Sequence, residues 1–364
     1  MKDFFSKFVT LLKENKKYQI VAIIVVAVLA ASSVWGYYLV TEGDFSISKI
    51  NKLAKEEAVE TVLARKLDGV IMNTEEETNP YPVAIMVENM STVRPQSGIS
   101  SASIVYEALA EGGITRFMLI FPGDKSLVKN IGPVRSARSY YIEWLSEYDA
   151  LYAFSGAYPP VLAAISGLQI KNINAMYDGS KYYWRDQSFS APHNMYTSSE
   201  NLGYALRDKG LDGVNEAKFK AWKFKDEVAL EDRPSEVKNI SIDFSGAAYS
   251  VEYKYDRESN TYLRFNAGAE HTDRNTSEQL TPKNVVVYKL PTRVIDDSGR
   301  LEMDVVGEGE ATMFSDGLAT KGTWKKTSRT DRTIFYNENG EEYEFSRGQT
   351  WVEVIPEDKG YEYN

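Results

Sequence analysis

The chain has 364 residues and no cysteine, so it can form no disulfide bond, thiolate metal site or cysteine nucleophile. Its two histidines fall on either side of a predicted domain boundary and match no metal-binding spacing. It has neither a glycine-rich dinucleotide motif nor a phosphate-loop lysine motif, and we therefore expect no metal and no cofactor. The formal charge of -10 argues against nucleic acid as a partner, because duplex binding requires a clustered basic face.

Long apolar runs are equally scarce, but one stands out at residues 20–40. A run of about 21 residues can cross roughly 30 Å of hydrocarbon as a helix. Lysines dominate the residues before it, whereas Glu42 and Asp44 follow it, and this asymmetry favours a cytoplasmic N-terminus. The sequence therefore predicts a cytoplasmic tail (1–17), a transmembrane signal anchor (18–40) and a folded part outside the cell membrane.

The alternative to an anchor is a cleaved signal peptide, whose apolar core is usually shorter. Ala30-Ala-Ser-Ser resembles a cleavage site, but the apolar run continues through Trp35, Tyr37 and Tyr38. Aromatic residues at this place are typical of a membrane-interface anchor. We expect a single-pass membrane protein that keeps its anchor.

The remaining sequence divides into a predicted helical stalk (41–66), an α/β domain (67–225), a charged linker (226–238) and a β-rich domain (239–358). In the α/β domain short apolar runs suited to buried strands alternate with helix-like stretches, which favours a layered α/β fold. The predicted strands are 83–87, 116–121 and 151–154, and the predicted helices are 100–110 and 136–148.

Beyond the linker the apolar residues alternate with a period of two, as in half-buried strands. The segments are 250–255, 261–265, 285–288, 333–336 and 351–355. Turn pairs Asp316-Gly317 and Asn339-Gly340 are typical of hairpins. The second domain is therefore predicted to be mainly antiparallel β.

The segment Ile131-Gly-Pro-Val-Arg-Ser-Ala-Arg138 concentrates groups that bind anions. A helix beginning near Ser136 would direct free backbone N–H groups at a ligand, and Arg135 and Arg138 would add guanidinium groups. The alternative is that both arginines pair with internal carboxylates.

Glu107 and Glu111 lie four residues apart, so they would share one face at the C-terminal end of the predicted helix. The negative pole of the helix would raise their pKa and suit one of them to act as a general acid. Asp149 or His193 would then serve as the base. The alternative is a solvated helix face or a set of salt bridges.

Several stretches resemble the YerB family of bacterial cell-envelope proteins, which contains the domain of unknown function DUF3048. The matching segments are Pro82-Val-Ala-Ile-Met-Val-Glu-Asn89, Arg94-Pro-Gln-Ser-Gly98, Ile104-Val-Tyr-Glu107, Glu111-Gly-Gly-Ile-Thr-Arg-Phe117, the 131–138 segment, Ala191-Pro-His-Asn194, Tyr262 with Arg264, His271 with Asp273, Asn284-Val-Val-Val287, Gly307 with Gly309, Gly322-Thr-Trp-Lys325 and Gly348-Gln-Thr-Trp351. The polar residues of these motifs are expected to converge on one ligand-binding cleft. The predicted ligand-binding residues are Glu88, Asn89, Arg94, Gln96, Arg116, Arg135, Ser136, Arg138, Asn194, His271 and Asp273.

The resemblance implies a two-domain α/β protein outside the cytoplasm, usually of Gram-positive bacteria, and implies no reaction. Many family members resemble lipoproteins, whereas this chain has no cysteine to carry a lipid, so a helix would replace the lipid as the tether.

Two classes of function follow from these observations. In the first, the arginines bind an anionic wall polymer or a lipid-linked precursor, and peptidoglycan or other envelope proteins are further expected partners. In the second, the chain is an enzyme that cleaves or transfers wall glycans with a Glu, Asp or His acid–base pair. A weaker third idea, a membrane-anchored phosphotransferase, lacks recognisable catalytic motifs.

Overall fold

The computed structural model describes residues 63–123, 127–212, 219–236 and 238–364. The predicted tail, membrane anchor and nearly all of the stalk lie outside this described part. Residues 63–66 of the stalk are described and are not helical, because Ala64 forms an antiparallel bridge with Ile71. No helix within the described ranges has the length and apolar character needed to span a membrane. Leu63–Asn364 is one compact unit.

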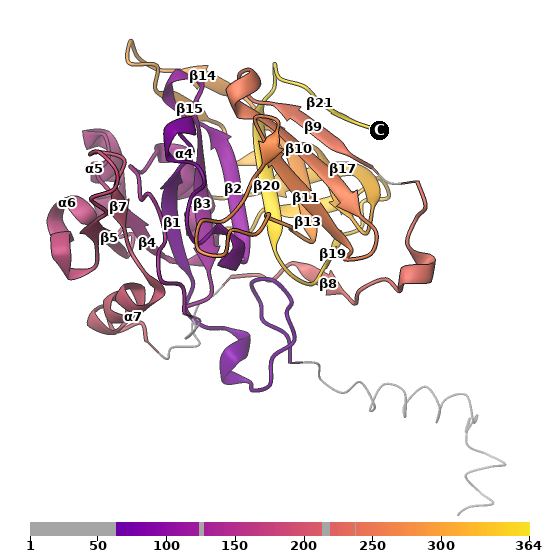
Figure 1. Ribbon diagram of the computed structural model, residues 1–364, viewed down its shortest axis with the longest axis horizontal. Helices are drawn as coiled ribbons and strands as arrows, with labels where there is room; N and C mark the ends of the chain where they lie inside the picture. The colour runs from indigo at the N-terminus through magenta and orange to yellow at the C-terminus, as the bar shows by residue number, and fades with distance from the viewer. Residues whose placement is uncertain (1–62, 124–126, 213–218, 237) are drawn as a thin grey trace, which may run out of the picture. The chain divides into compact units, whose positions relative to one another are not determined.

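A ten-stranded mixed sheet runs through this unit (Figure 1). Its strands in spatial order are β18 (Ile334–Asn337), β17 (Leu318–Lys326), β16 (Gly307–Ser315), β13 (Asn284–Leu290), β20 (Thr350–Pro356), β2 (Ile104–Leu109), β3 (Thr115–Phe121), β1 (Val83–Glu88), β4 (Leu151–Phe154) and β5 (Asn172–Asn174). Parallel pairing of β2 with β20 joins the N-terminal strands to the C-terminal ones. Strands of both predicted domains therefore lie in one sheet with a continuous core.

The central strands are almost uniformly apolar because both faces of the sheet are covered. Every residue of β1, β2, β3 and β4 is buried. The predicted strands at 83–87, 116–121 and 151–154 are confirmed.

One face of the sheet, here called the helix face, packs against α4 (Ser139–Leu145). Trp144 of α4 stacks on Tyr106 of β2, with 5.3 Å between ring centroids. Cross-strand pairing places Met118 beside Tyr106 on the same face. These large rings bury much apolar area and fix the helix on the sheet.

The opposite face, here called the inter-sheet face, packs against a five-stranded sheet. That sheet contains, in spatial order, β12 (Ala269–Glu270), β11 (Thr261–Asn266), β10 (Ser250–Asp256), β9 (Ile240–Asp243) and β21 (Tyr361–Tyr363). Tyr253 of β10 meets Trp351 of β20 edge to face at 6.3 Å. Figure 1 shows β10 and β11 lying against β20.

The other elements are shorter and lie around these layers. The helices are α5 (Pro159–Gly167), α6 (Ala175–Asp178) and α7 (Ser199–Asp208). The two-stranded ribbons are β14 (Thr292–Val294) with β15 (Leu301–Met303), β8 (Lys223–Lys225) with β19 (Glu344–Ser346), and β6 (Trp184–Arg185) with β7 (Met195–Tyr196). The 3₁₀ turns are η1 (Glu76–Thr78), η2 (Ser91–Val93), η3 (Ile99–Ser101), η4 (Glu111–Gly113), η5 (Ser146–Tyr148), η6 (Gly179–Lys181), η7 (Leu230–Asp232) and η8 (Ala247–Tyr249).

The predicted helix at 100–110 is wrong. The segment forms the end of η3 and then β2, whose six residues are all buried. A strand covered on both faces loses its alternation, so its apolar run cannot be told from a buried helix by periodicity. The predicted helix at 136–148 is confirmed for α4 and η5, but α4 begins only at Ser139.

The predicted C-terminal strands are confirmed, and most pair antiparallel. Asp316-Gly317 is the two-residue turn between β16 and β17, with φ of 54° and 76°. Positive φ at both turn positions is what a tight hairpin of matching twist requires. The region thus combines a mixed α/β N-terminal part with a mostly antiparallel C-terminal part. The predicted linker at 226–238 contains η7.

Candidate functional site

The residues predicted to bind a ligand fall into two groups that the ten-stranded sheet separates. Adjacent strand residues point to opposite faces. Glu88 of β1 and its cross-strand partner Arg116 of β3 lie on the helix face. Glu107 of β2 pairs with Phe117 and lies on the inter-sheet face. The two groups are therefore described in turn.

The first group contains Arg116, Arg135 and Arg138, here called the arginine cluster. Arg116 stands at the start of β3. The other two lie on the segment between β3 and α4, which is held to the sheet by a bridge between Val134 and Val87. Because this segment is extended, α4 starts after the arginines and not near Ser136 as predicted.

Two of the three arginines pair with carboxylates. Arg138 donates two hydrogen bonds to Glu111, through Nε and Nη2, each 2.5 Å long. Arg135 Nε lies 3.1 Å from Glu88 Oε1. The alternative that both arginines pair with internal carboxylates is the one that the structure shows.

Arg116 differs from these two arginines. Its Nη1 donates to the carbonyl oxygen of Ser136 at 2.8 Å, and its Nε has no hydrogen-bond partner. Within the described ranges no carboxylate lies at ion-pair distance from it, although only 6% of the residue is exposed. Burial and the neighbouring charge of Arg138 lower the pKa of Arg116 to about 10. A buried cation beside like charges is a place where a bound anion would be stabilising.

Glu111 does not share a helix face with Glu107, and this prediction is wrong. Glu107 lies in β2, and Glu111 follows in η4 after the strand has ended. Burial alone would raise the pKa of Glu111, but the hydrogen bonds and charge of Arg138 outweigh it and lower the pKa below its usual value. Glu111 is thus held as a carboxylate and is not prepared to act as an acid.

This pKa shift predicts a contribution to stability that is lost in acid. A carboxyl group whose pKa is lower in the folded state stabilises the fold above its unfolded pKa, near 4.3, and loses that effect as pH falls through the folded value. Glu111→Gln should therefore flatten the fall of the urea midpoint between about pH 5 and pH 3. The exposed Glu308, paired with Lys325, offers Glu308→Gln as the control; equal acid profiles for Glu111→Gln and wild type would contradict the prediction.

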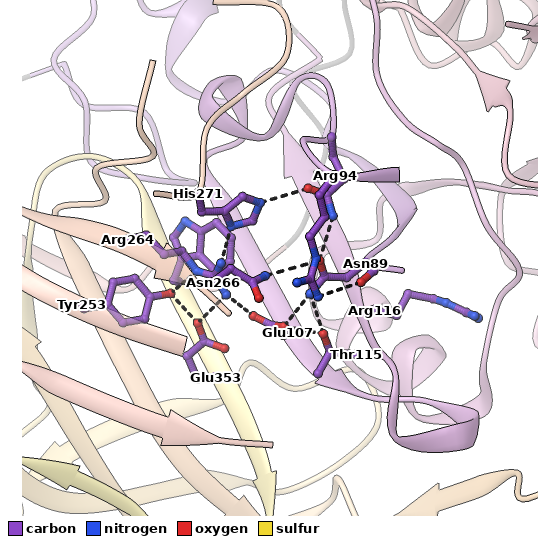
Figure 2. Close-up of polar contacts among 12 residues, drawn as sticks. Asn89, Arg94, Glu107, Thr115, Arg116, Tyr253, Arg264, Asn266, His271 and Glu353 are labelled. Carbon is purple, nitrogen blue, oxygen red and sulfur yellow. Dashed lines mark hydrogen bonds and ion pairs between the residues drawn. The ribbon is translucent and has the colours of Figure 1, made fainter. Parts of the chain in front are cut away.

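The second group is a buried polar network around Arg264 of β11 (Figure 2). Glu107 and Glu353 are direct partners in the β2–β20 pairing, and both they and Arg264 have 0% exposure. Arg264 Nη2 donates to Glu107 and lies 3.8 Å from Glu353 Oε1. Its Nε donates to the Tyr253 hydroxyl at 2.9 Å, and that hydroxyl donates to Glu353. Arg264 of the five-stranded sheet is therefore the cation that faces two adjacent acids of the ten-stranded sheet.

The electrostatics of this network fix its protonation. Burial, and then the charge of Glu107, raise the pKa of Glu353 well above its usual range and favour its protonated form. Burial, and then the charge of Arg264, lower the pKa of His271 well below its usual value, so His271 is neutral. Arg264 and Glu107 remain as one compensated pair, which is the arrangement that a dry interior tolerates.

Other predicted residues complete the same network. Asn89 donates to Glu107 at 3.1 Å, and Gln96 donates to Asn89 at 2.8 Å while its Oε1 accepts from His271 Nε2 at 3.0 Å. Arg94 donates to Asn89 and to the carbonyl oxygen of Ala248. These side chains are engaged inside the protein, and Figure 2 shows Arg116 directed away from them.

The remaining predicted residues have separate places. Asp273 is buried and accepts from the backbone N–H groups of Gly98 and Ser100. Asp149 precedes β4 and pairs with Lys171, at the opposite end of β1 from Glu88. Asn194 accepts from Arg185. Ser136 donates to the carbonyl oxygen of Ser155 beside the arginine cluster.

His193 joins the arginine cluster through Glu88. Its Nδ1 lies 2.8 Å from Glu88 Oε2, while the other oxygen of Glu88 faces Arg135. Of the candidate bases, His193 lies beside the arginines and Asp149 does not.

Sequence reasoning missed Thr115 and Glu353 as neighbours of Glu107, and Tyr253 as a partner of Glu353. Thr115 donates to Glu107 at 2.5 Å. A signal was present for Glu353, because a charged residue inside the apolar run Trp-Val-Glu-Val-Ile needs a buried partner. The partner's identity depends on pairing between distant strands, which periodicity does not reveal.

Comparison with known proteins agrees with the resemblance seen in the sequence. The family described as "Protein of unknown function (DUF3048) N-terminal domain" matches residues 67–212, and its C-terminal domain matches residues 240–352. "Putative lipoprotein YerB" of Bacillus subtilis (strain 168) is 31% identical over 300 residues, covering 81% of this chain and 88% of the relative. A crystal structure of the YerB protein from Bacillus subtilis matches with a TM-score of 0.72 at 28% identity, covering 83% of this chain and 99% of that one. The chain therefore belongs to the DUF3048 family that includes YerB, a family of unknown function.

Proposed function

We propose that this chain is a membrane-anchored protein of the bacterial cell envelope that binds an anionic wall polymer or lipid-linked precursor at the arginine cluster. Residues 18–40 would form the anchor, with residues 1–17 in the cytoplasm and the folded unit outside. The name of the Bacillus subtilis relative, "Putative lipoprotein YerB", supports an envelope location. The charge asymmetry around the apolar run supports the orientation.

The observation that carries the binding proposal is the buried, uncompensated guanidinium of Arg116. Three guanidinium groups, those of the arginine cluster, face two carboxylates, Glu88 and Glu111, which leaves a net charge of +1 when His193 is neutral. A phosphate or carboxylate oxygen would supply the missing partner and accept charge-assisted hydrogen bonds. The protein retains a buried cation that no carboxylate compensates within the described residues, which favours a binding role.

The competing reading, a glycan-cleaving enzyme with Glu107 or Glu111 as the acid, is less well supported. Glu107 is enclosed between two sheets and paired with Arg264. Glu111 is fixed as a carboxylate by Arg138. These contacts engage both acids that such a reaction would need.

Binding can be tested with the full chain in detergent micelles and three immobilised probes: poly(glycerol phosphate), polygalacturonate and peptidoglycan stripped of attached polymer. We expect binding to at least one polyanion that weakens as salt rises. Arg116→Met should weaken it about 10- to 100-fold, the effect of losing a charged hydrogen bond. The phosphate and carboxylate arms identify which oxyanion is bound.

A matched variant separates binding from folding. Arg293 is an exposed arginine paired with Glu302 and Asp304, and Arg293→Met should leave affinity unchanged. Arg116→Met should also melt within a few degrees of wild type or above it, because it removes a buried charge without a carboxylate partner. Equal affinity of wild type and Arg116→Met, or preference for stripped peptidoglycan over both polyanions, would overturn the proposal.

A further inference from the structure

We propose that His193 and Glu88 form a proton-transfer pair that hydrolyses a phosphodiester held by the arginine cluster. This inference rests on the proposed function, since the arginines must first bind the anion. The substrate would be a phosphodiester polymer, and the reaction would be its hydrolysis.

The first support is the geometry of the pair. Glu88 is 3% exposed and is fixed at both ends: its backbone N–H donates to Pro133 O at 3.0 Å, and Arg135 faces its Oε1. Its Oε2 meets His193 Nδ1 at 2.8 Å. The imidazole is half-buried, with 27% of its side chain exposed. A rigid, buried carboxylate that orients an accessible imidazole is the usual arrangement of a histidine base.

The second support is the tautomer that this contact selects. The carboxylate of Glu88 is an acceptor, so Nδ1 of a neutral His193 must be the donor. Nε2 then carries the lone pair. Within the described residues Nε2 has no hydrogen-bond partner, which leaves it free to take a proton.

The third support is that Glu88 does not need His193 for charge compensation. Arg135 already provides the opposite charge at 3.1 Å. A histidine that served only to neutralise Glu88 would be redundant, whereas a base that Glu88 orients has a reason to lie here.

The charge of the site fits a phosphodiester. The excess of one positive charge of the arginine cluster over Glu88 and Glu111 matches the single negative charge of the ligand. Attack on phosphorus develops further negative charge on the phosphoryl oxygens, and the guanidinium of Arg116, whose Nε has no hydrogen-bond partner, would stabilise it. Burial of these groups strengthens that stabilisation.

The step balances with water as the co-reactant. Nε2 of His193 takes a proton from water while the water oxygen forms a bond to phosphorus. The bond from phosphorus to one ester oxygen breaks, and the proton passes from His193 to that leaving oxygen. The products are a phosphomonoester and an alcohol, and His193 returns to its neutral form.

The experiment uses the full chain in detergent with poly(glycerol phosphate), and it counts new phosphomonoester ends as phosphate released by added phosphatase. Affinity for the same polymer is measured in parallel. We expect wild type to generate ends, and His193→Gln to lower kcat about 100-fold or more while its Kd stays within about threefold. Glu88 is a positioning residue, so Glu88→Gln should lower kcat without raising KM, whereas a folding defect would affect both.

Chemical labelling gives a second readout. The chain has only two histidines, and His271 is 3% exposed, so diethylpyrocarbonate should modify His193 alone. Bound poly(glycerol phosphate) should protect it. Binding without new ends, ends formed equally by His193→Gln, or labelling unaffected by polymer would overturn this inference and leave the binding proposal intact. Absence of polymer binding by wild type would instead overturn the binding proposal, and this one with it.

Discussion

Replacing Arg264 with methionine is expected to lower the free energy of unfolding by about 3–5 kcal/mol, as breaking a buried ion pair from one side does. Arg264 is the cation at ion-pair distance from both Glu107 and Glu353 in the described part of the chain. Its removal leaves a carboxylate between two sheets with 0% exposure. Urea unfolding of the full chain, followed by tryptophan fluorescence, measures the loss.

The deficit of Arg264→Met should depend on pH in a defined direction. An uncompensated buried carboxylate takes up a proton more readily than the same group in the unfolded chain. The folded variant then binds more protons than the unfolded one, so its stability falls as pH rises. The difference from wild type is therefore expected to be smaller at pH 5 than at pH 8.

Two further variants test the cause. Glu107→Gln combined with Arg264→Met removes the stranded charge, and the pair should lose less than the sum of the single changes. The exposed Arg293→Met should change stability by no more than about 0.5 kcal/mol. A loss for Arg264→Met below 1 kcal/mol, or strict additivity with Glu107→Gln, would mean that the network does not hold the two sheets together.

Eight of the strands that the structure describes were predicted from the sequence, and β2 shows why another was not. The β10 burial pattern alternates, because one face packs on the main sheet and the other meets solvent. β2 is buried throughout, so its sequence carries no period, and Glu107 within it suggested a helix face. The covering of both faces is a property of the tertiary structure that local sequence does not encode.

The sequence predicted that these motif residues gather, but it did not predict their division between two faces of the sheet. The polar residues of the family motifs do gather at one end of β1, β2 and β3, yet strand alternation sends Glu88 and Arg116 to one face and Glu107 to the other. The predicted cleft contained residues of a buried network and residues of the arginine cluster together. Register and pairing with β20 decide which residues meet, and both are set by contacts far apart in the sequence.

Glu147→Gln is expected to destabilise the protein by about 3–5 kcal/mol, for the reason opposite to that of Arg264→Met. Glu147 of η5 is the carboxylate between two buried cations, 3.0 Å from Lys326 and 2.8 Å from Arg332. It also accepts from Thr333 N–H at 3.0 Å. The substitution keeps the shape of the side chain and leaves two buried like charges without a counterion.

The stability of Glu147→Gln should change with pH in the direction opposite to that of Arg264→Met. Burial already lowers the pKa of Lys326, and Glu147 is the next largest influence and raises it. Without Glu147 the folded state releases this proton more readily than the unfolded chain, so stability should rise with pH. The Glu147→Gln deficit is therefore expected to shrink towards pH 9, whereas that of Arg264→Met grows.

Adding Lys326→Met to Glu147→Gln removes one of the two uncompensated cations and should recover part of the lost stability. The other cation, Arg332, still stacks on Trp222, with 3.8 Å between Cζ and the ring centroid. Lys325, the exposed neighbour that pairs with Glu308, gives Lys325→Met as the control and should recover nothing. Parallel pH profiles for Glu147→Gln and Arg264→Met would contradict both assignments of charge, because general loosening of the fold gives the two variants the same slope. Opposite slopes of stability against pH require that Glu147→Gln leaves buried cations without a counterion and that Arg264→Met leaves a buried carboxylate without one.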